Sequence, residues 1–187
     1  MSDGKARFRP AARGAEFTLG NRIARAVFQL AWLGLARFTP PFLHSWRRLV
    51  LRTFGAKIGA GTRVYASVRI WLPGNLAIGS GCIIGPRVRL YNQGRITIGD
   101  DCVVSQDASL CASTHSPHDP AFALQLSPIT IADQCWIAAE AFVGPGVSMG
   151  EGAVLGARGA LFEDAEPVTI YRGNPAAPIG PRKLERR

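Results

Sequence analysis

Two histidines in one polar segment are the residues of this chain best able to do chemistry. His115 and His118 lie in the sequence THSPHDPAFALQLSP, and His44, the third and last histidine, lies far from them. A neutral imidazole can take a proton from a hydroxyl group and return it to a leaving group, so either side chain could act as a general base. The residues alone fit two exposed loop histidines equally well, and both interpretations stay open at this point.

Four cysteines are a second kind of reactive group, but their spacing is not that of a metal or redox site. Cys82, Cys102, Cys111 and Cys135 form no CxxC pair and no cysteine and histidine ligand pattern. Cys82, Cys102 and Cys135 recur at the same place of a sequence repeat, where other members are also small or β-branched. We therefore expect them to serve as small apolar residues, and we expect no metal site.

A six-residue repeat must position these groups. From Ile58 the chain reads IGAGTR, VYASVR, IWLPGN, then IGSGCI, IGPRVR, LYNQGR, then IGDDCV, VSQDAS, LCASTH, and it resumes after the histidine segment from IADQCW to LFEDAE. Each block begins with Ile, Val, Leu or Met, and its fifth residue is small or β-branched. This period fits neither a helix nor plain strand alternation, and it predicts short extended segments joined by bends, three to a coil.

The repeat predicts an all-β solenoid of roughly five to six coils, with the first residue of each block pointing inward. Glycine recurs in second place, which we attribute to unusual backbone dihedrals that glycine adopts at low cost. We expect a basic helical segment over 1–57, the solenoid over 58–171 with an excursion loop at 111–128, and a C-terminal tail over 172–187. Loops on a rigid scaffold often carry function, which favours a role for the excursion.

The N-terminal segment carries the whole charge excess of the chain. Residues 1–57 hold 11 basic and 2 acidic residues, a net charge of +9, which equals that of the full chain. We expect one helix within 21–38, and a second over 42–53 with Thr39 as its N-cap and Gly55 as its stop. The polar face expected for the second helix holds His44, Arg47, Arg48 and Arg52.

Two interpretations of these helices stay open. Both helices can simply cover the unpaired strand edges at the end of the solenoid. Alternatively, residues 21–54 make peripheral contact with an anionic membrane, through the arginines, Trp32 and Trp46. No nucleic acid is expected, because no recognisable binding module accompanies the basic residues. The apolar run 26–36 is too short to span a bilayer and too far from Met1 for a signal peptide, so we expect a cytoplasmic protein.

Part of the repeat resembles a known enzyme family. The pattern around the histidine segment, followed by PITI, WIAA and GNPA, is similar to the exopolysaccharide O-acetyltransferases that decorate colanic acid, within the hexapeptide acyltransferases. The matching residues are Ser105, Asp107, Leu110, Cys111, His115, Asp119, Pro120, Phe122, Ile129, Trp136, Ile137 and 173–176. The resemblance implies a left-handed parallel β-helix, a homotrimer and acetyl-CoA as the acyl donor. It also implies that His115, four residues before Asp119, is the catalytic base and that His118 is not.

The same resemblance implies binding residues. Those that would face the pantetheine arm of acetyl-CoA are Trp136, Ala139 and Ala157. Relatives often carry basic residues near Phe162-Glu163 and at Ala177, but none stands there in this chain. The remaining candidates for contact with the CoA phosphates are Arg158, Arg182 and Lys183. The implied sugar ligands are Asn92 and Gln93. Many relatives have an acid at the position of Ser116, so the partner that orients the catalytic imidazole is left open.

Together these observations predict an acetyl-CoA-dependent O-acetyltransferase. The expected acceptor is a sugar hydroxyl of a surface polysaccharide precursor, lipid-linked or nucleotide-activated, and the expected place is the cytoplasm, at the inner face of the membrane if the helices bind lipid. A non-catalytic scaffold or binding protein is an alternative, and so is transfer to an amino acceptor. Zinc carbonic anhydrases of the γ type share the scaffold, but such a site needs three ligands, and only His115 and His118 are near the coils.

Overall fold

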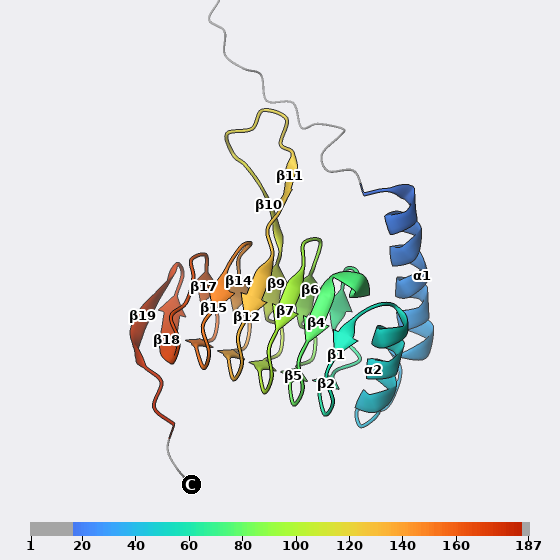
Figure 1. Ribbon diagram of the computed structural model, residues 1–187, viewed down its shortest axis with the longest axis horizontal. Coiled ribbons are helices and arrows are strands. Elements are labelled where there is room, and N and C mark those ends of the chain that lie inside the picture. The colour runs from blue at the N-terminus through green and yellow to red at the C-terminus, as the bar shows by residue number, and fades with distance from the viewer. Residues whose placement is uncertain (1–16, 185–187) are drawn as a thin grey trace, which may run out of the picture.

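The six-residue period produces a triangular coil in the computed structural model, which describes residues 17–184 (Figure 1). Three parallel sheets form the faces, and each complete coil gives one strand to each sheet. Strands of successive coils pair in register, as Arg69 of one coil pairs with Arg89 of the next. Five coils are complete and β18 begins a sixth, as the repeat predicts.

The elements follow the order of the repeat. The helices are α1 (Leu19–Leu35) and α2 (His44–Thr53), and a 3-10 turn covers Pro73–Asn75. The first sheet holds β1 (Lys57–Ile58), β4 (Leu76–Ile78), β7 (Ile96–Ile98), β12 (Ile129–Ile131) and β15 (Ser148–Met149). The second holds β2 (Arg63–Val64), β5 (Ile83–Ile84), β8 (Val103–Val104), β13 (Trp136–Ile137), β16 (Val154–Leu155), β18 (Thr169–Gly173) and β19 (Ala176–Pro181). The third holds β3 (Arg69–Ile70), β6 (Arg89–Tyr91), β9 (Ser109–Cys111), β14 (Phe142–Val143) and β17 (Ala160–Leu161), and β10 (Ser113–His115) pairs with β11 (Leu124–Leu126).

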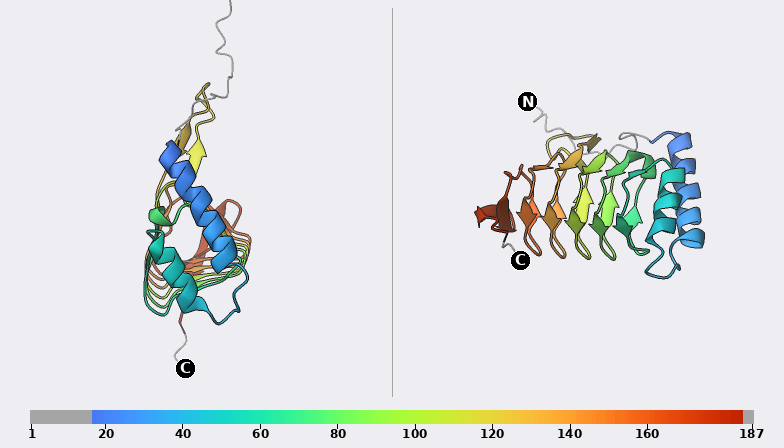
Figure 2. Two further views of the ribbon diagram at one scale, coloured as in Figure 1. Left: turned by 90° about the vertical axis from the view of Figure 1, so that its right-hand side faces the viewer. Right: turned by 60° about the horizontal axis from the view of Figure 1, so that its bottom comes forward.

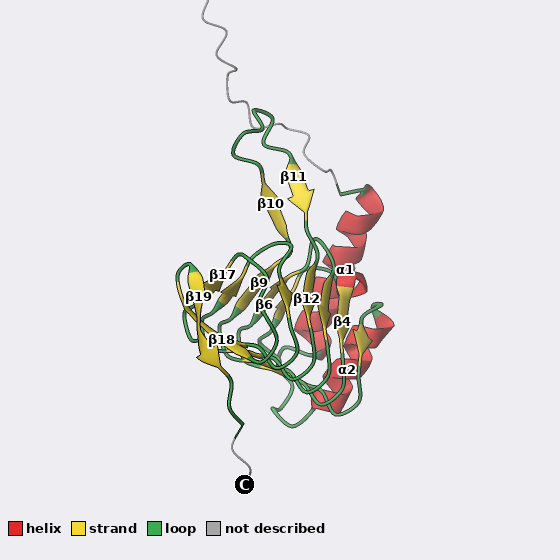
Figure 3. Ribbon diagram, turned by 60° about the vertical axis from the view of Figure 1, so that its left-hand side comes forward, coloured by secondary structure: helices red, strands yellow, loops and turns green. Residues whose placement is uncertain are grey.

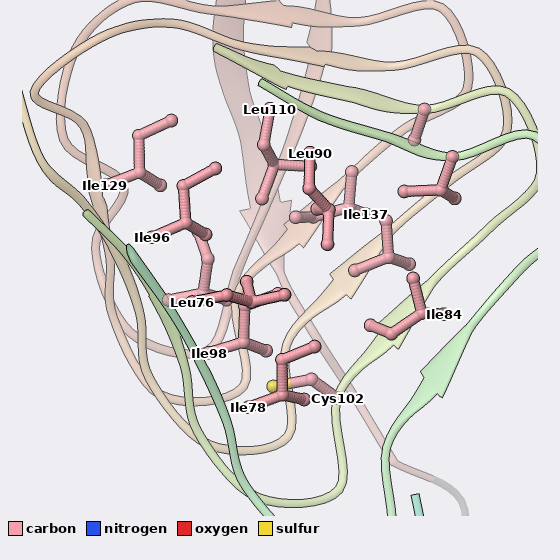
Figure 4. Packing of buried hydrophobic residues seen from close by; sticks show 14 of the residues in the cluster. Leu76, Ile78, Ile84, Leu90, Ile96, Ile98, Cys102, Leu110, Ile129 and Ile137 are labelled. Carbon is pink, nitrogen blue, oxygen red and sulfur yellow. The ribbon is translucent and has the colours of Figure 1, made fainter. Parts of the chain in front are cut away.

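The core is a column of aliphatic side chains along the axis of the solenoid. The first residue of every block is buried, from Ile58 to Leu161, as predicted. Figure 4 shows Ile78, Ile84, Leu90 and Ile98 among the side chains that point into the triangle. Burial of these groups is the main stabilising contribution, because it removes apolar surface from water in every coil.

The three cysteines in fifth place lie buried in one corner, as expected for small apolar residues. They stack from coil to coil, and the Cys82 thiol donates to the Gly99 carbonyl oxygen at 3.0 Å. The hydrogen bond with Cys102, and then burial, raise the pKa of the Cys82 thiol. The hydrogen bond with Cys135 raises the pKa of Cys102 to about 12. Cys82 and Cys102 are therefore protonated and poorly nucleophilic.

The physical reason predicted for the second-place glycines is wrong. Left-handed backbone occurs instead at the fourth residue of most blocks, at Gly61 with a φ of 73° and at Arg87 with a φ of 59°. The second-place glycines are needed for close approach of neighbouring coils: a Cβ on Gly59 would lie 2.4 Å from the carbonyl carbon of Gly79. Contact between coils, rather than dihedral freedom, excludes side chains there.

Both helices lie across the N-terminal end of the coil stack, so the predicted cap is confirmed (Figure 2). Phe28 and Trp32 of α1 and Val50 and Leu51 of α2 join the core. Gly55 ends α2 with a φ of 91°, as expected. Among residues 17–184, no helix has the length and apolar character needed to cross a membrane.

Two details of the second helix differ from the prediction. Thr39 is not its N-cap; α2 begins after Leu43 without a side-chain cap, and the Thr39 hydroxyl donates to the Ala36 carbonyl oxygen. Arg47 is fully buried instead of lying on an exposed polar face. Its guanidinium donates to the Val64 carbonyl oxygen at 2.6 Å and to main-chain carbonyls of the loop between the helices. The Arg47 side chain thus ties that loop to the first coil.

The C-terminal segment is part of the solenoid rather than a separate tail. The boundary expected between residues 171 and 172 falls inside β18, which pairs in parallel with β16. The chain then turns back as β19, antiparallel to β18. This hairpin covers the last edge of the second sheet, since β19 pairs with β18 where a strand of a further coil would otherwise lie.

Candidate active site

The excursion predicted at 111–128 forms a hairpin that stands out from the coil stack (Figure 3). Its strands β10 and β11 are antiparallel, and His115 ends β10 opposite Leu124. The hairpin leaves the coil at the end of β9 and returns at β12, so it rises from the corner between the third and first sheets. His115 is half-buried at the outer end of β10, whereas His118 is exposed in the loop between β10 and β11.

The His115 ring is held by Phe122 in two ways. The two rings stack in parallel with their centroids 4.0 Å apart. His115 Nδ1 also lies 2.8 Å from the Phe122 carbonyl oxygen. A carbonyl oxygen only accepts hydrogen bonds, so Nδ1 carries the proton, and Nε2 of the neutral ring is left with its lone pair. This contact answers the question of what orients the imidazole, which the sequence leaves open.

Asp119 supports the backbone that presents this carbonyl group. Phe122 has a φ of 52°, a left-handed conformation that is rare for a bulky residue. The Asp119 carboxylate accepts hydrogen bonds from the main-chain N–H groups of Ala121 and Ala123, at 2.8 and 2.9 Å. These bonds hold the pKa of Asp119 below its ordinary value. They fix the residues on both sides of Phe122 and so stabilise the strained position.

His115 lines a pocket of about 400 Å³ together with Tyr91, Gln93 and Ser113. Gln93 Nε2 donates to the Tyr91 hydroxyl oxygen at 3.1 Å, and within the described residues the buried Gln93 Oε1 accepts no hydrogen bond. The structure therefore brings Gln93, one of the two predicted sugar ligands, beside His115. Its Oε1 can still accept a hydrogen bond.

Asn92 has a different role. It is fully buried, and its side-chain oxygen accepts from the main-chain N–H groups of Trp71 and Leu72. Its amide nitrogen donates to the Leu72 carbonyl oxygen at 2.6 Å. The side chain thus joins two neighbouring coils, and its polar atoms are satisfied by the fold itself.

A basic and aromatic surface adjoins this pocket on the third sheet. Arg69, Trp71, Arg89 and Tyr91 line a cavity that shares Tyr91 with the histidine pocket. Within the described residues neither Arg69 nor Arg89 has a carboxylate partner. Sequence reasoning missed this pair, although both arginines are sixth members of their blocks and lie one coil apart.

The residues predicted to bind the acyl donor lie elsewhere on the chain. Trp136 is exposed on the second sheet, its indole N–H donates to the Ser105 hydroxyl at 3.0 Å, and it shares a pocket with Arg182. Arg182 also donates to the carbonyl oxygens of Gln134 and Gly152. Lys183, the next residue, is exposed.

Ala139 and Ala157 occupy equivalent turns of two successive coils. The Arg158 main-chain N–H donates to the Ala139 carbonyl oxygen at 2.9 Å, which sets these turns side by side. The Arg158 guanidinium pairs with Glu140 at 2.8 Å. Both turns follow the second sheet, whereas His115 rises from the far end of the third. A single chain therefore does not bring the histidine to the predicted donor residues.

Metal-ligating side chains do not gather in the part of the chain that the structure describes. No group of three or more His, Cys, Asp or Glu residues there could hold a metal ion.

Comparisons with known proteins agree with this architecture. No protein-family model matches the chain. It is 38% identical over 166 residues to the putative colanic acid biosynthesis acetyltransferase WcaF of Escherichia coli, a match that covers 89% of this chain and 91% of the relative. A shorter match, 40% identical over 73 residues, is to a chloramphenicol acetyltransferase of Escherichia coli, covering 36% of this chain and 35% of that one.

Among solved structures, a hexapeptide-repeat acetyltransferase from Vibrio cholerae in complex with acetyl coenzyme A superposes with a TM-score of 0.82. It is 21% identical, and the match covers 91% of this chain and 95% of that one. This likeness shows the fold, the left-handed parallel β-helix that the sequence predicts. Together with the long match to the Escherichia coli relative, it shows that the chain is an acetyltransferase and belongs to the hexapeptide-repeat family, in the group of the putative colanic acid biosynthesis enzymes.

Proposed function

We propose that the protein transfers the acetyl group of acetyl-CoA to a sugar hydroxyl, with His115 as the general base. The observation that carries the proposal is the contact between His115 Nδ1 and the Phe122 carbonyl oxygen, which leaves Nε2 unprotonated in the neutral ring. A fixed tautomer beside a pocket is what general base catalysis requires.

The reaction needs one proton relay and no covalent enzyme intermediate. His115 Nε2 takes the proton of the sugar hydroxyl while the hydroxyl oxygen bonds to the thioester carbonyl carbon. The carbon–sulfur bond of the resulting tetrahedral species then breaks, and the imidazolium returns its proton to the sulfur of CoA. The products are the acetyl ester and the free thiol. Such relays contribute typically ~10²- to 10⁴-fold to the rate.

The donor groove comes from a neighbouring subunit in this proposal. Within one chain His115 and Trp136 line separate pockets. In a homotrimer, the turns at Ala139 and Ala157 of one subunit would face the hairpin of the next and admit the pantetheine arm. Small side chains in both turns support that role. An acetyltransferase of the same fold has been solved with acetyl coenzyme A, which supports the identity of the donor.

The residues predicted to contact the CoA phosphates differ in whether their side chains already form an ion pair. Arg158 is already paired with Glu140. Arg182 lies beside Trp136 in one pocket, and Lys183 follows it as an exposed cation. We therefore propose Arg182 and Lys183 as the main phosphate contacts, with Arg158 contributing at the edge of the turn.

We propose a lipid-linked or nucleotide-activated sugar of a surface polysaccharide as the acceptor, used in the cytoplasm at the inner face of the membrane. The Escherichia coli relative is named for colanic acid biosynthesis, which supports a polysaccharide precursor. Gln93 Oε1 would accept a hydrogen bond from the sugar beside His115, while Asn92 supports the wall of the site. Arg69 and Arg89 lie next to this pocket without a carboxylate partner among residues 17–184, which favours an acceptor that carries phosphate.

Release of free thiol from acetyl-CoA tests the proposal, measured with a panel of neutral sugars, amino sugars and sugar phosphates. We expect His115→Ala to lower turnover of the preferred acceptor at least ~100-fold, with His118→Ala close to wild type. Loss of activity in His118→Ala alone would reassign the base. An amino sugar preferred over every hydroxyl acceptor would replace O-acetylation by N-acetylation.

A further inference from the structure

The face of helix α1 that contacts the coils combines apolar and polar side chains. Phe28 and Trp32 pack on the first coil, and two polar residues, Arg25 and Gln29, contact the coils beside them. Gln29 donates its amide to a main-chain carbonyl of β3 at 2.8 Å, and the Arg25 guanidinium lies 4.0 Å from the centre of the Trp71 ring. A helix that covers a core normally turns such groups to water.

The exposed face of α1 is apolar, and at Leu30 and Leu33 it borders a pocket between the helix and the coils. Its side chains recur at helical spacing and all are exposed, Leu30 by 70%. The residues of this stripe are Leu19, Ile23, Val27, Leu30 and Leu33. Ala26 and Gly34 fall between them on the same side of the helix. No described residue covers the stripe, whereas Phe28 and Trp32 on the opposite side of the helix are buried.

The exposed apolar surface continues past the end of α1. Phe38 and Phe42, in the connection to α2, are exposed by 82% and 77%, and Leu49 is exposed on α2. Trp46 belongs to the same region, because its indole N–H donates to the Leu35 carbonyl oxygen at 2.7 Å. We call the five residues of the α1 stripe together with Phe38, Phe42, Trp46 and Leu49 the cap face. Both helices lie at one end of the molecule (Figure 2).

Charge distinguishes between the possible occupants of the cap face. Residues 17–57 contain seven basic residues and no acidic one. Arg22 and Arg37 are exposed near the two ends of α1. A second copy docked face to face across a two-fold axis would bring the same arginines against one another, and like charges oppose that contact. A surface that is apolar within and basic at its border matches the headgroup region of an anionic bilayer.

We infer that the cap face docks on an anionic membrane, with α1 lying in the plane of the lipid headgroups. Leucine, isoleucine and valine of the stripe enter the boundary with the acyl chains, and Arg22 and Arg37 contact lipid phosphates. The helix does not cross the bilayer, because its 17 residues span only about 25 Å and one of its faces is bound to the coils.

Docking in this way orients the whole solenoid. The coils stack away from the membrane, and the basic surface of Arg69 and Arg89 runs from the cap toward the hairpin of His115. If the acceptor is a lipid-linked glycan, its phosphate would lie along this surface and its sugar at the histidine. This consequence rests on the proposed function, whereas the docking itself does not.

Flotation of the full chain with lipid vesicles tests the inference. We expect binding to vesicles of phosphatidylcholine mixed with phosphatidylglycerol, weak binding to phosphatidylcholine alone, and loss of binding at high salt. The double variant Ile23→Ser/Leu30→Ser should bind the anionic vesicles at least ~10-fold less. The matched control, Val168→Ser/Ile179→Ser, removes two exposed aliphatic residues at the opposite end of the solenoid and should bind like wild type.

Thiol release with a soluble acceptor separates this inference from the proposed function. Both double variants should keep wild-type turnover and thermal stability, because none of the four positions lies in the proposed site. Anionic vesicles bound equally by wild type and Ile23→Ser/Leu30→Ser would overturn the inference, as would failure of the wild type to float. A smaller oligomer in that variant, without any change in flotation, would assign the cap face to contact between copies and would also overturn it.

Discussion

At the scale of single residues, the tautomer of His115 depends on a main-chain contact. The residue after His115 is Ser116, which has no carboxylate to accept a hydrogen bond from the imidazole. The Phe122 carbonyl oxygen accepts the hydrogen bond from His115 Nδ1. A carbonyl group holds the tautomer without adding a full negative charge. The imidazole therefore depends on the hairpin, through Asp119, for its orientation.

Phe122 is expected to be a positioning residue. Replacement of Phe122 by alanine removes the stacked ring and lets the imidazole rotate, so we expect turnover to fall about 10- to 100-fold. Phe122→Tyr keeps the ring and should stay within a few fold of wild type. The KM for acetyl-CoA should be unchanged in both, because the proposed donor groove is formed by other residues. Steady-state thiol release measures these values, and full activity in Phe122→Ala would show that stacking has no part in catalysis.

At the scale of elements, the spacing between coils decides which residues a turn can hold. The fourth residue of a block takes left-handed backbone, and non-glycine residues such as Arg87 and Glu140 accept its cost. Where the second residue is glycine, as at Gly59, Gly79 and Gly150, it faces the next coil at a distance that leaves no room for a methyl group. The space between neighbouring coils therefore restricts the residue type at these glycines more strictly than the left-handed backbone does at the fourth residue of a block.

Alanine substitutions at two glycines test whether contact between coils excludes a side chain. A Cβ at Gly59 would lie 2.4 Å from backbone atoms of Gly79 and Ser80, so Gly59→Ala must push the first two coils apart. We expect a loss of about 1 to 3 kcal/mol in the free energy of unfolding. Gly74→Ala meets no atom within 4 Å and should leave stability unchanged or slightly raised. Urea unfolding followed by circular dichroism measures both, and equal stabilities would refute the role assigned to coil contact.

At the scale of the whole molecule, the fold places the proposed base and the predicted donor residues on different corners of one chain. His115 rises from the corner after β9, and the turns at Ala139 and Ala157 follow strands of another sheet. A rigid solenoid cannot bend to join them, because every coil is paired with its neighbours along its length. Association of copies is the simple way to complete such a site.

Mixed oligomers test this arrangement. His115→Ala removes the base, and Ala157→Trp should block the pantetheine groove while leaving the exposed turn intact, so each variant alone should lose at least ~100-fold in activity. When the two are co-expressed at equal levels, about a quarter of the sites that combine two chains receive an intact histidine and an intact groove. We expect thiol release to recover to about that fraction of wild type. No recovery would mean that each chain holds a complete site.

The sequence by itself determined the solenoid, the inward first residues, the corner cysteines, the excursion and the presence of a helical cap. These features follow from the local sequence, because each six-residue block has the same structural preference. Stacking then repeats the same structure in every coil. The resemblance to the acetyltransferases was equally readable, because its motifs are contiguous. The choice of His115 over His118, and the groove residues, remain predictions.

Only the tertiary structure decided which partner each polar group meets. Arg47 is indistinguishable from Arg48 in a helical pattern until the loop between the helices closes over it. The apolar stripe of α1 could not be assigned to the inside or the outside, since periodicity defines a face but not what it packs against. Contacts between residues distant in the chain also decide three further features: the burial of Asn92, the need for glycine at position 59 and the tautomer of His115. Such contacts exist only once coils and hairpin are in place, and no local pattern encodes them.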